Sequence, residues 1–317
     1  MYKIAVAMNP IETLDPTKDS TFSLMNQLQI DAELLYIIPD SLVLDNKIVK
    51  AKVSKVSIDK LTEPFYKLSK TKEIQLNKID AILFRVDPPV NDYYLNIAHI
   101  LGKLEEGGIL VINSPSAIRL MNEKILGDCY SPNTLPSIIS NNIETIERFV
   151  NKHKNVVVKP LNMMAGKLIN KTSVKDKAFK KKVRQTQKND PSNFIIVQKY
   201  IDVQKYGDMR IILYNGEVHE RGLLRFPKKN EFRSNLAQGG NYKIKNVDTK
   251  MFRHLTIVSQ ILKNNGIYFA GVDVIDKFIT EINITSPTGL QEIDGNTNDL
   301  SSKVARSFLD LIDQHKS

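Results

Sequence analysis

The sequence predicts a mixed α/β fold in which a parallel sheet covered by helices precedes antiparallel strands. Three observations lead to this prediction. Short apolar runs alternate with amphipathic stretches in the first third of the chain, which is typical of βαβ units. Asn215-Gly216, the strongest kind of short hairpin signal, separates two strand-like runs. Two further apolar strands lie near the end of the chain, within GVDVIDKFITEINITSPTG.

The chain has 317 residues, which is enough for two or three subdomains. Pro115 and Ser116 suit the start of a helix, so we place the first boundary shortly after them. The first domain, residues 1–122, is expected to contain strands at 2–8, 32–38, 81–86 and 109–113 and helices at 21–30 and 96–108.

The rest of the chain divides near residue 202. Residues 123–202 are expected to contain helices at 143–153 and 171–188 and strands at 155–160 and 193–201. Residues 203–317 are expected to contain the hairpin at 209–220, helices at 249–264 and 301–315, and the strand pair that ends near residue 284.

Composition excludes several classes of protein. No apolar run approaches the roughly 20 residues of a membrane span, and the opening MYKIAVAMNP is too short for a signal peptide. Cys129 is the only cysteine, which excludes an intramolecular disulfide and argues against a thiolate metal cluster. We therefore expect a cytoplasmic protein without a membrane partner.

The net charge of +10 is compatible with nucleic acid or with an anionic small molecule as partner. We interpret the densest lysine run, residues 171–188, as a solvated helix and expect no nucleic-acid partner. Arginine is more informative because its planar group grips carboxylate or phosphate with two hydrogen bonds. Four arginines fall close together: Arg210, Arg221, Arg225 and Arg233.

Two carboxylates and one amide stand on the last strand pair. Glu281 and Asn283 are two residues apart and so share one face of a strand, and Asp273 precedes them on the neighbouring strand. These oxygen ligands suit Mg²⁺, which prefers carboxylates together with bound phosphates. The alternative is an exposed polar face on an edge hairpin.

The register of this hairpin decides whether the three side chains meet. If residues 276–278 form a three-residue loop, Ile275 pairs with Ile279 and Asp273 lies opposite Glu281. Directly opposed residues have Cβ atoms about 4.5–5.5 Å apart. A two-residue loop would move Asp273 to the other face, so the prediction needs an odd loop.

Further signals appear in an order that fits a nucleotide-phosphate enzyme. Lys124 stands at a helix start, Lys159 ends an apolar strand, and the segment 198–201 follows a second strand. Asp208 and the arginines come next, before the carboxylates. No Walker or dinucleotide-binding glycine motif is present.

This order resembles the ATP-grasp superfamily, and the chain is similar to bacterial glutathione synthetases from end to end. The similar segments are MNPIETLDPTKDSTFSLM, RVDPPVN, VINSPSAIRLMNEK, GDMRIILYNGE, LLRFPKKNEFRSNLAQGG and GVDVIDKFITEINITSPTG. The resemblance implies an ATP-grasp fold with an N-terminal βαβ (Rossmann-like) domain, a small lid subdomain and a C-terminal antiparallel-sheet subdomain.

The resemblance also implies roles for individual residues. ATP would contact Lys124, Lys159, Gln198, Lys199, Tyr200, Ile201 and Asp208. Two Mg²⁺ ions, or Mn²⁺, would be held by Asp273, Glu281 and Asn283. The phosphoryl group and the acyl substrate would face Arg210, Arg225, Arg233 and Asn235. The peptide substrate would contact Arg85, Asp87, Ser286, Pro287 and Thr288.

The implied reaction joins γ-glutamylcysteine and glycine to form glutathione, with ATP consumed and ADP and phosphate released. The substrate carboxylate attacks the γ-phosphoryl group, and glycine displaces phosphate from the acylphosphate. The family also implies a homo-oligomer. Two alternatives stay open: a ligase that joins another acid and amine, and a non-catalytic nucleotide-binding protein with a degenerate lid loop.

One segment departs from the family pattern. The lid strand of the family reads Lys-Pro-Leu-Asp-Gly-Met-Gly-Gly, whereas residues 159–166 of this chain read KPLNMMAG. Glycine lets a backbone approach phosphate closely, and methionine or alanine does so less freely. We expect this difference to affect rate and substrate rather than fold.

Overall fold

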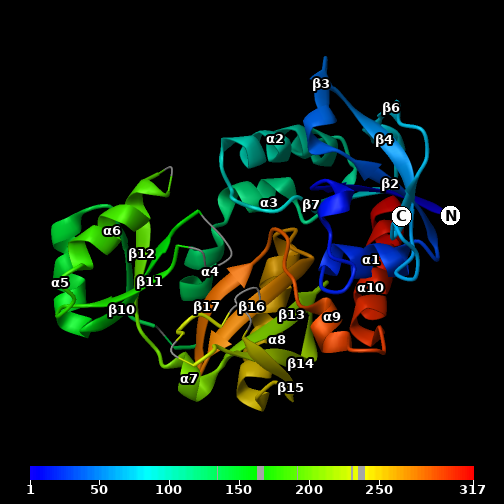
Figure 1. Ribbon diagram of the computed structural model, residues 1–317. Helices are drawn as coiled ribbons and strands as arrows, with labels where there is room; N and C mark the ends of the chain where they lie inside the picture. Colours follow the sequence, from blue (N-terminus) through cyan, green and yellow to red (C-terminus); the bar gives the residue numbers. More distant parts are fainter. Residues whose placement is uncertain (134, 163–167, 191, 230, 235–239) are drawn as a thin grey trace.

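The computed structural model spans residues 1–317 and describes all of them except 134, 163–167, 191, 230 and 235–239. Figure 1 shows three sheets, which follow one another along the chain from blue to orange. Within the described ranges, no helix is long and apolar enough to cross a membrane.

The first sheet contains the predicted parallel strands. Its order is β3-β4-β2-β1-β7-β8. Strand β1 is parallel to both of its neighbours, β2 and β7, and β7 is parallel to β8. The strands are β1 Tyr2–Met8, β2 Ala32–Ile37, β3 Val43–Asp45, β4 Ile48–Ile58, β5 Tyr66–Leu68, β6 Lys72–Gln75, β7 Ala81–Arg85 and β8 Leu110–Ile112. The connecting helices are η1 Ile11–Thr13, α1 Ser20–Leu28, η2 Pro39–Ser41, η3 Leu76–Lys78, α2 Asp92–Glu106 and α3 Pro115–Leu120.

Helix α1 begins at Asp19, whose carboxylate accepts hydrogen bonds from the backbone N–H groups of Thr21 and Phe22. This N-cap satisfies two donors that have no partner inside the helix. The C-terminal helices α9 Leu290–Asp294 and α10 Asp299–Lys316 lie beside α1 and share its apolar core. The end of the chain therefore returns to the first sheet.

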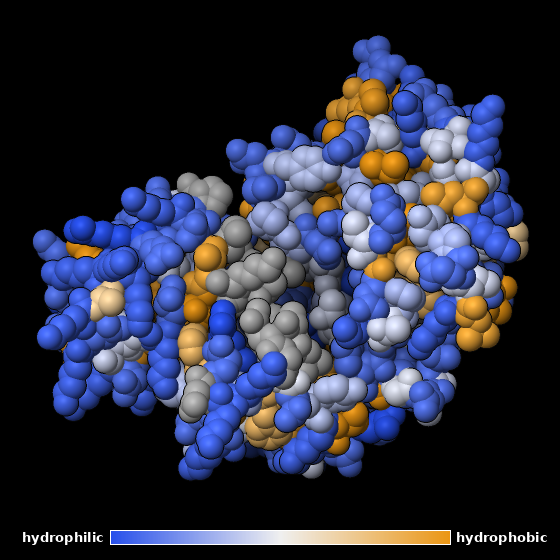
Figure 2. All heavy atoms as spheres, viewed as in Figure 1, coloured by the Kyte–Doolittle hydropathy of each residue, from blue (hydrophilic) through white to orange (hydrophobic). Residues whose placement is uncertain are grey.

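The second sheet has the order β11-β10-β12-β9. Its strands are β9 Ser137–Ser140, β10 Asn155–Pro160, β11 Asn170–Ser173 and β12 Ile195–Lys199, and its helices are α5 Ile143–His153 and α6 Phe179–Lys188. Hydrophilic side chains dominate the surface over α5 and α6 in Figure 2, as expected for a lysine-rich solvated face.

The predicted helix at 171–188 is wrong over its first part. Residues 170–173 form strand β11, in which Lys171 pairs with Val157 of β10, and the helix begins only at Phe179. Pairing with β10 decides this segment, because the lysine-rich composition by itself fits either structure. Phe179 and Val183 give α6 its buried face.

The third sheet has the order β15-β14-β13-β16-β17 and is antiparallel throughout. Its strands are β13 Asp208–Tyr214, β14 Glu217–Phe226, β15 Asn241–Asn246, β16 Phe269–Ile275 and β17 Phe278–Asn283, with helices α7 Val203–Tyr206 and α8 Thr249–Asn264. The predicted turn joins β13 to β14, and both Asn215 and Gly216 have positive φ angles, of 44° and 85°.

The first and third sheets are joined through Asn113, which is buried. Its side-chain amide donates to the carbonyl groups of Phe269 and Ile284, and its oxygen accepts from the N–H groups of Tyr268 and Phe269. Helix α4 Glu123–Cys129 packs against β17. These contacts fix the third sheet against the N-terminal region and bring the predicted site residues together.

Candidate functional site

The predicted register of the last hairpin is confirmed, although its loop is different. Asp273 pairs with Glu281, as expected. The loop has two residues rather than three, because Ile275 pairs with Phe278. A β-bulge at Thr280 inserts one extra residue into β17 and restores the register. The bulge therefore supplies the odd residue that was expected in the loop.

Cross-strand pairing builds the centre of the site. Arg210 of β13 pairs with Asp273 of β16, and Asp208 of β13 pairs with Arg225 of β14. Arg210 holds Asp273 with two hydrogen bonds, Nε to Oδ1 at 2.8 Å and Nη2 to Oδ2 at 2.7 Å. Arg225 adds a third at 2.9 Å.

The two carboxylates of this cluster titrate in opposite directions. Burial disfavours ionisation of Asp273, but Arg210 and Arg225 outweigh it and lower the pKa of Asp273 to about 2. Burial raises the pKa of Asp208 and prevails over the opposing charge of Arg225. Within the described part of the chain, Asp208 Oδ1 is buried without a hydrogen-bond partner. Of these two carboxylates, Asp208 is therefore the one that can still accept a hydrogen bond from a ligand.

The side-chain oxygens of Glu281 and Asn283 have fewer protein contacts than those of Asp273. The Asn283 amide nitrogen donates to Gly271 O and, at 3.3 Å, to Asp273 Oδ2, which leaves its oxygen as an acceptor. Glu281 Oε1 lies 3.7 Å from the ammonium of Lys124. The described residues bring no three His, Cys, Asp or Glu side chains together as metal ligands, so the set depends on the amide. Two carboxylates and an amide oxygen fit a hard cation such as Mg²⁺.

Two lysines approach the same centre. Lys124 Nζ donates to Leu161 O at 3.1 Å in addition to its contact with Glu281. Lys159, at the end of β10, has no hydrogen-bond or ion-pair partner among the described residues, and burial lowers its pKa. A half-buried ammonium without a partner is suited to an anionic ligand such as phosphate.

A cavity of about 1120 Å³ connects these groups. The predicted site residues that line it are Asp87, Lys159, Gln198, Lys199, Tyr200, Ile201, Asp208, Arg210, Arg225, Arg233, Asp273, Glu281, Asn283, Ser286, Pro287 and Thr288. Lys124 and Arg85 are not among the lining residues. Asn235 and residues 163–166 of the predicted lid lie outside the described residues.

The end of β12 and the two residues that follow it form one wall of the cavity. Lys199 N donates to Pro136 O and Tyr200 N donates to Asn155 O, so the backbone of this segment is fixed. The side-chain nitrogen of Gln198 is buried without a described hydrogen-bond partner. Lys171 of β11 lies over the Tyr200 ring, 3.5 Å from its centroid.

Arg85 supports the loop after β17 from behind. It is buried, donates to Pro287 O at 3.0 Å and to Thr21 Oγ1 at 3.1 Å, and does not line the cavity. Ser286 Oγ donates to Asp87, whose pKa is raised by burial. The first domain therefore fixes this loop through two side chains.

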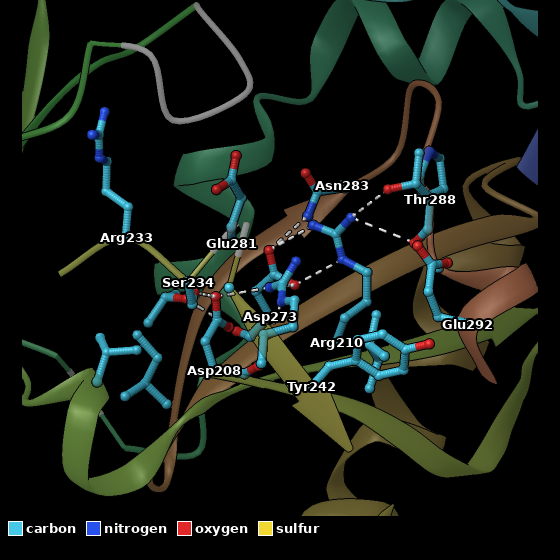
Figure 3. A pocket seen from close by; sticks show the side chains of 18 of the residues that line it. Asp208, Arg210, Arg233, Ser234, Tyr242, Asp273, Glu281, Asn283, Thr288 and Glu292 are labelled. Carbon is cyan, nitrogen blue, oxygen red and sulfur yellow. Dashed lines mark hydrogen bonds and ion pairs between the residues drawn. The ribbon is translucent and has the colours of Figure 1, made fainter. Parts of the chain in front are cut away.

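Sequence reasoning missed other residues that line the cavity. They come from the segment before α1, from the segment between β14 and β15, from β15 and from α9, and include Lys18, Asp19, Ser234, Tyr242, Gln291 and Glu292. Figure 3 shows Ser234, Tyr242 and Glu292 among them. Only Asp19 had a sequence signal, as the cap of α1. Helix α9 has five residues, too few for a recognisable periodicity.

Comparison with known proteins agrees with this geometry. A profile described as "Prokaryotic glutathione synthetase, N-terminal domain" matches residues 2–119, and one described as "Prokaryotic glutathione synthetase, ATP-grasp domain" matches residues 123–298. Glutathione synthetase of Buchnera aphidicola subsp. Schizaphis graminum is 33% identical over 297 residues, 93% of this chain and 92% of that protein. Glutathione synthetase of Prochlorococcus marinus subsp. pastoris is 34% identical over 314 residues, 98% of this chain and 100% of that protein.

Solved structures support the fold. D-cycloserine synthetase is similar with a TM-score of 0.66 and 12% identity, over 98% of this chain and 99% of that one. D-alanyl-alanine synthetase A from Vibrio cholerae has a TM-score of 0.63 and 12% identity, over 98% of each chain. The predicted ATP-grasp fold is thereby confirmed. Since the profiles and the relatives cover most of its length, the chain belongs to the prokaryotic glutathione synthetase family.

Proposed function

We propose that this protein is an ATP-dependent ligase that joins γ-glutamylcysteine and glycine to form glutathione, through an acylphosphate, with release of ADP and phosphate. The family supports this reaction. The observation that carries it in the structure is one cavity in which Lys159, without a partner among the described residues, lies beside the row of Arg210, Asp273 and Glu281. Phosphoryl transfer needs positioned positive charge of this kind.

ATP would lie between the second and third sheets. The segment Gln198–Ile201 would contact the adenine, and Lys124 and Lys159 would contact the phosphates. Asp208 lines the same cavity, and its Oδ1, which accepts no hydrogen bond from the described residues, would accept one from the nucleotide. These residues support a nucleotide site in this part of the cavity.

ATP-grasp enzymes use ATP with Mg²⁺. In this chain Asp273, Glu281 and Asn283 would hold the cation, and we propose two ions, with Mn²⁺ as a substitute. Bound cations would neutralise charge on the phosphate oxygens. Because both Asp273 oxygens already accept from guanidinium groups, Glu281 and Asn283 are the ligands least committed to other contacts.

The arginines would act on the acyl group. Arg210 and Arg225 are held in place by Asp273 and Asp208, so their charge is positioned before the substrate binds. Arg233 pairs with Glu231 at the cavity edge, and we assign the same role to Arg233 and to Asn235. Their charge would stabilise the phosphoryl group and the tetrahedral intermediate.

The peptide substrate would contact Ser286, Pro287, Thr288 and Asp87, which line the cavity. Arg85 would act indirectly, by holding the Pro287 carbonyl group. The side of the cavity formed by the first domain would therefore receive the peptide.

Several broader expectations remain proposals. We propose domains at residues 1–122, 123–202 and 203–317, a lid around residues 159–166, and a homo-oligomer in the cytoplasm. Partners would be the small molecules ATP, γ-glutamylcysteine and glycine, without nucleic acid or membrane.

Release of phosphate from ATP tests this function. The full chain is assayed with γ-glutamylcysteine and glycine together and with each omitted. Release that requires both substrates supports the proposal. Release with only a different acid or amine would assign a different ligase reaction. Nucleotide binding without release under any condition would assign a non-catalytic protein.

A further inference from the structure

The cavity extends beyond the predicted site to the first domain and to α9. At this end its lining includes Gln291 and Glu292 of α9 and five residues of the first domain: Thr13, Asp15, Thr17, Lys18 and Asp19. Its charged groups here are the carboxylates of Asp15, Asp19, Asp87 and Glu292 and the ammonium of Lys18. The negative excess distinguishes this end from the arginine-rich centre and favours a cationic group of a ligand.

Three of these carboxylates already have partners. Asp15, Asp19 and Asp87 each accept a hydrogen bond of 2.9 Å or shorter from a neighbouring N–H or O–H group. Lys18 lies 3.5 Å from Asp15 and makes no ion pair with Glu292. Neighbouring groups of the protein therefore supply hydrogen bonds to the three aspartates, and Glu292 remains to be considered.

Glu292 differs because its Oε2 atom is buried and accepts no hydrogen bond from any described residue. Burial raises the pKa of Glu292, and its own backbone N–H group and the positive charges of Arg210, Arg225 and Lys18 oppose that shift. Arg210 does not donate to Glu292 Oε2. Nε and Nη2 of its guanidinium bind Asp273, and Nη1 binds Thr288 (Figure 3). A buried acceptor without a donor costs free energy that a ligand can recover.

The chemistry of the donor that Glu292 lacks follows from its charge. A carboxylate accepts hydrogen bonds only, and an ammonium group offers three N–H donors together with the opposite charge. The carboxylate groups of the substrates have the arginines as partners. Among the residues assigned to the peptide substrate, the carboxylate that could face an ammonium group is Asp87, and it already accepts a hydrogen bond from Ser286. Glu292 lines the same cavity as the loop at Thr288, next to the proposed peptide site.

We propose that Glu292 binds the ammonium group of an amino-acid substrate. This inference rests on the proposed function, which supplies two such groups: the α-ammonium of the γ-glutamyl residue and the ammonium of glycine. Both offer the same chemistry to the carboxylate. Glu292 would therefore determine specificity for amino acids over acids of the same shape that lack the amine.

The experiment compares the wild type with Glu292→Gln, which keeps the size of the side chain and removes its charge. We expect the KM for one ammonium substrate to rise about tenfold or more, with the KM for ATP changed by less than about twofold. The control Glu12→Gln makes the same chemical change at an exposed residue near this end that does not line the cavity, and should leave all KM values within about twofold.

An analogue identifies which ammonium is bound. Glutarylcysteine is γ-glutamylcysteine without its α-ammonium group. If Glu292 binds that group, Glu292→Gln weakens use of γ-glutamylcysteine but not of glutarylcysteine. If it binds glycine, the KM for glycine rises equally with either acid. Unchanged KM values for both substrates overturn the inference, as does an equal loss with both acids when the KM for glycine is unchanged.

The wild type gives a second test that does not depend on folding of the variant. Glutarylcysteine in place of γ-glutamylcysteine, or glycolate as a competitor of glycine, should bind about tenfold more weakly than the amine that it replaces. Equal binding of both analogues overturns the inference. Absence of wild-type turnover refutes the proposed function and this inference with it, whereas turnover with unchanged variant KM values refutes only the role of Glu292.

Discussion

The backbone of Gly127 in α4 lies directly against the backbone of Glu281 in β17. A Cβ atom at position 127 would be 2.8 Å from Glu281 N and 2.9 Å from Thr280 C. No side chain fits at that distance without movement of the strand. The same helix contributes Lys124, whose ammonium lies 3.7 Å from Glu281 Oε1. The close approach therefore sets the position of one proposed metal ligand.

Substitution Gly127→Ala should disturb the site through this contact. We expect the free energy of unfolding to fall by about 1–3 kcal/mol, because the added methyl group has only backbone to displace. The Mg²⁺ concentration for half-maximal activity should rise at the same time. Gly102→Ala is the matched control: its Cβ would meet only the Arg119 side chain, at 3.6 Å. Equal effects of both substitutions on the Mg²⁺ requirement would refute the prediction.

Substitution Glu281→Gln tests the proposed metal ligand directly. It removes one negative charge and keeps the shape of the side chain, so turnover should fall by about tenfold or more while the fold persists. The measurements are kcat at saturating ATP and Mg²⁺ and the thermal unfolding midpoint. Glu220→Gln, an exposed change on β14 outside the cavity, should have no effect on kcat. Unchanged turnover in Glu281→Gln would remove this residue from the metal site.

Much of this site could be predicted from the sequence because it consists of local patterns on regular strands. Glu281 and Asn283 are two residues apart, which places them on one face of β17. Pairing of β17 with β16 then places Asp273 opposite Glu281. The bulge at Thr280 could not be predicted, because a one-residue register shift changes the loop without changing the pattern of apolar residues. The predicted pairing of Asp273 with Glu281 was correct because a three-residue loop, or a two-residue loop followed by a bulge, adds the same one residue between the two strands.

Long-range packing explains what the sequence did not predict. Arg85 was expected in the substrate pocket, but its guanidinium is buried against Pro287 O and Thr21. Glu292 comes from a short helix whose position depends on α1 and α10, elements at opposite ends of the chain. Residues 170–173 became a strand because β10 offered a pairing edge. A single sequence contains no local signal for such contacts.

The stability contributed by Asp273 should depend on acid pH. Its pKa is about 2 in the folded protein and about 3.9 when unfolded, so its carboxylate stabilises the fold fully above about pH 4. This contribution is lost as the pH falls from about 4 to about 2. Asp273→Asn leaves Arg210 without its buried carboxylate partner and Arg225 with Asp208 alone, and should cost about 3 kcal/mol at pH 7.

Urea unfolding at several pH values checks this expectation. The difference between wild type and Asp273→Asn should be constant near neutral pH and should shrink below about pH 4. Asp310→Asn is the control, because its ion pair with Arg306 is exposed and should contribute less than about 1 kcal/mol at any pH. A difference that grows as the solution becomes more acidic would contradict the assignment.

Asn162 stands where the family pattern has aspartate, and its contacts explain why an amide suits this chain. Asp190, which is 2% exposed, accepts from Asn162 N at 2.7 Å and from Asn162 Nδ2 at 3.2 Å. Asn122 in turn donates to the Asn162 oxygen. A carboxylate at position 162 would face the buried Asp190 carboxylate, and like charges at such distances strongly disfavour joint ionisation.

Substitution Asn162→Asp should therefore weaken ATP binding at neutral pH, since residue 162 lies within the proposed lid. The repulsion raises the pKa of one of the two carboxylates in the folded state, so the destabilisation appears above the unfolded pKa of about 4 and is relieved as pH falls. The KM for ATP and the free energy of unfolding should both be closer to the wild-type values at about pH 5 than at about pH 8. Asn162→Ala removes the same amide donor without adding charge, and its losses should not change over this range. If the two variants instead show the same losses at both pH values, the repulsion between residues 162 and 190 does not occur and the amide has no special role at the base of the lid.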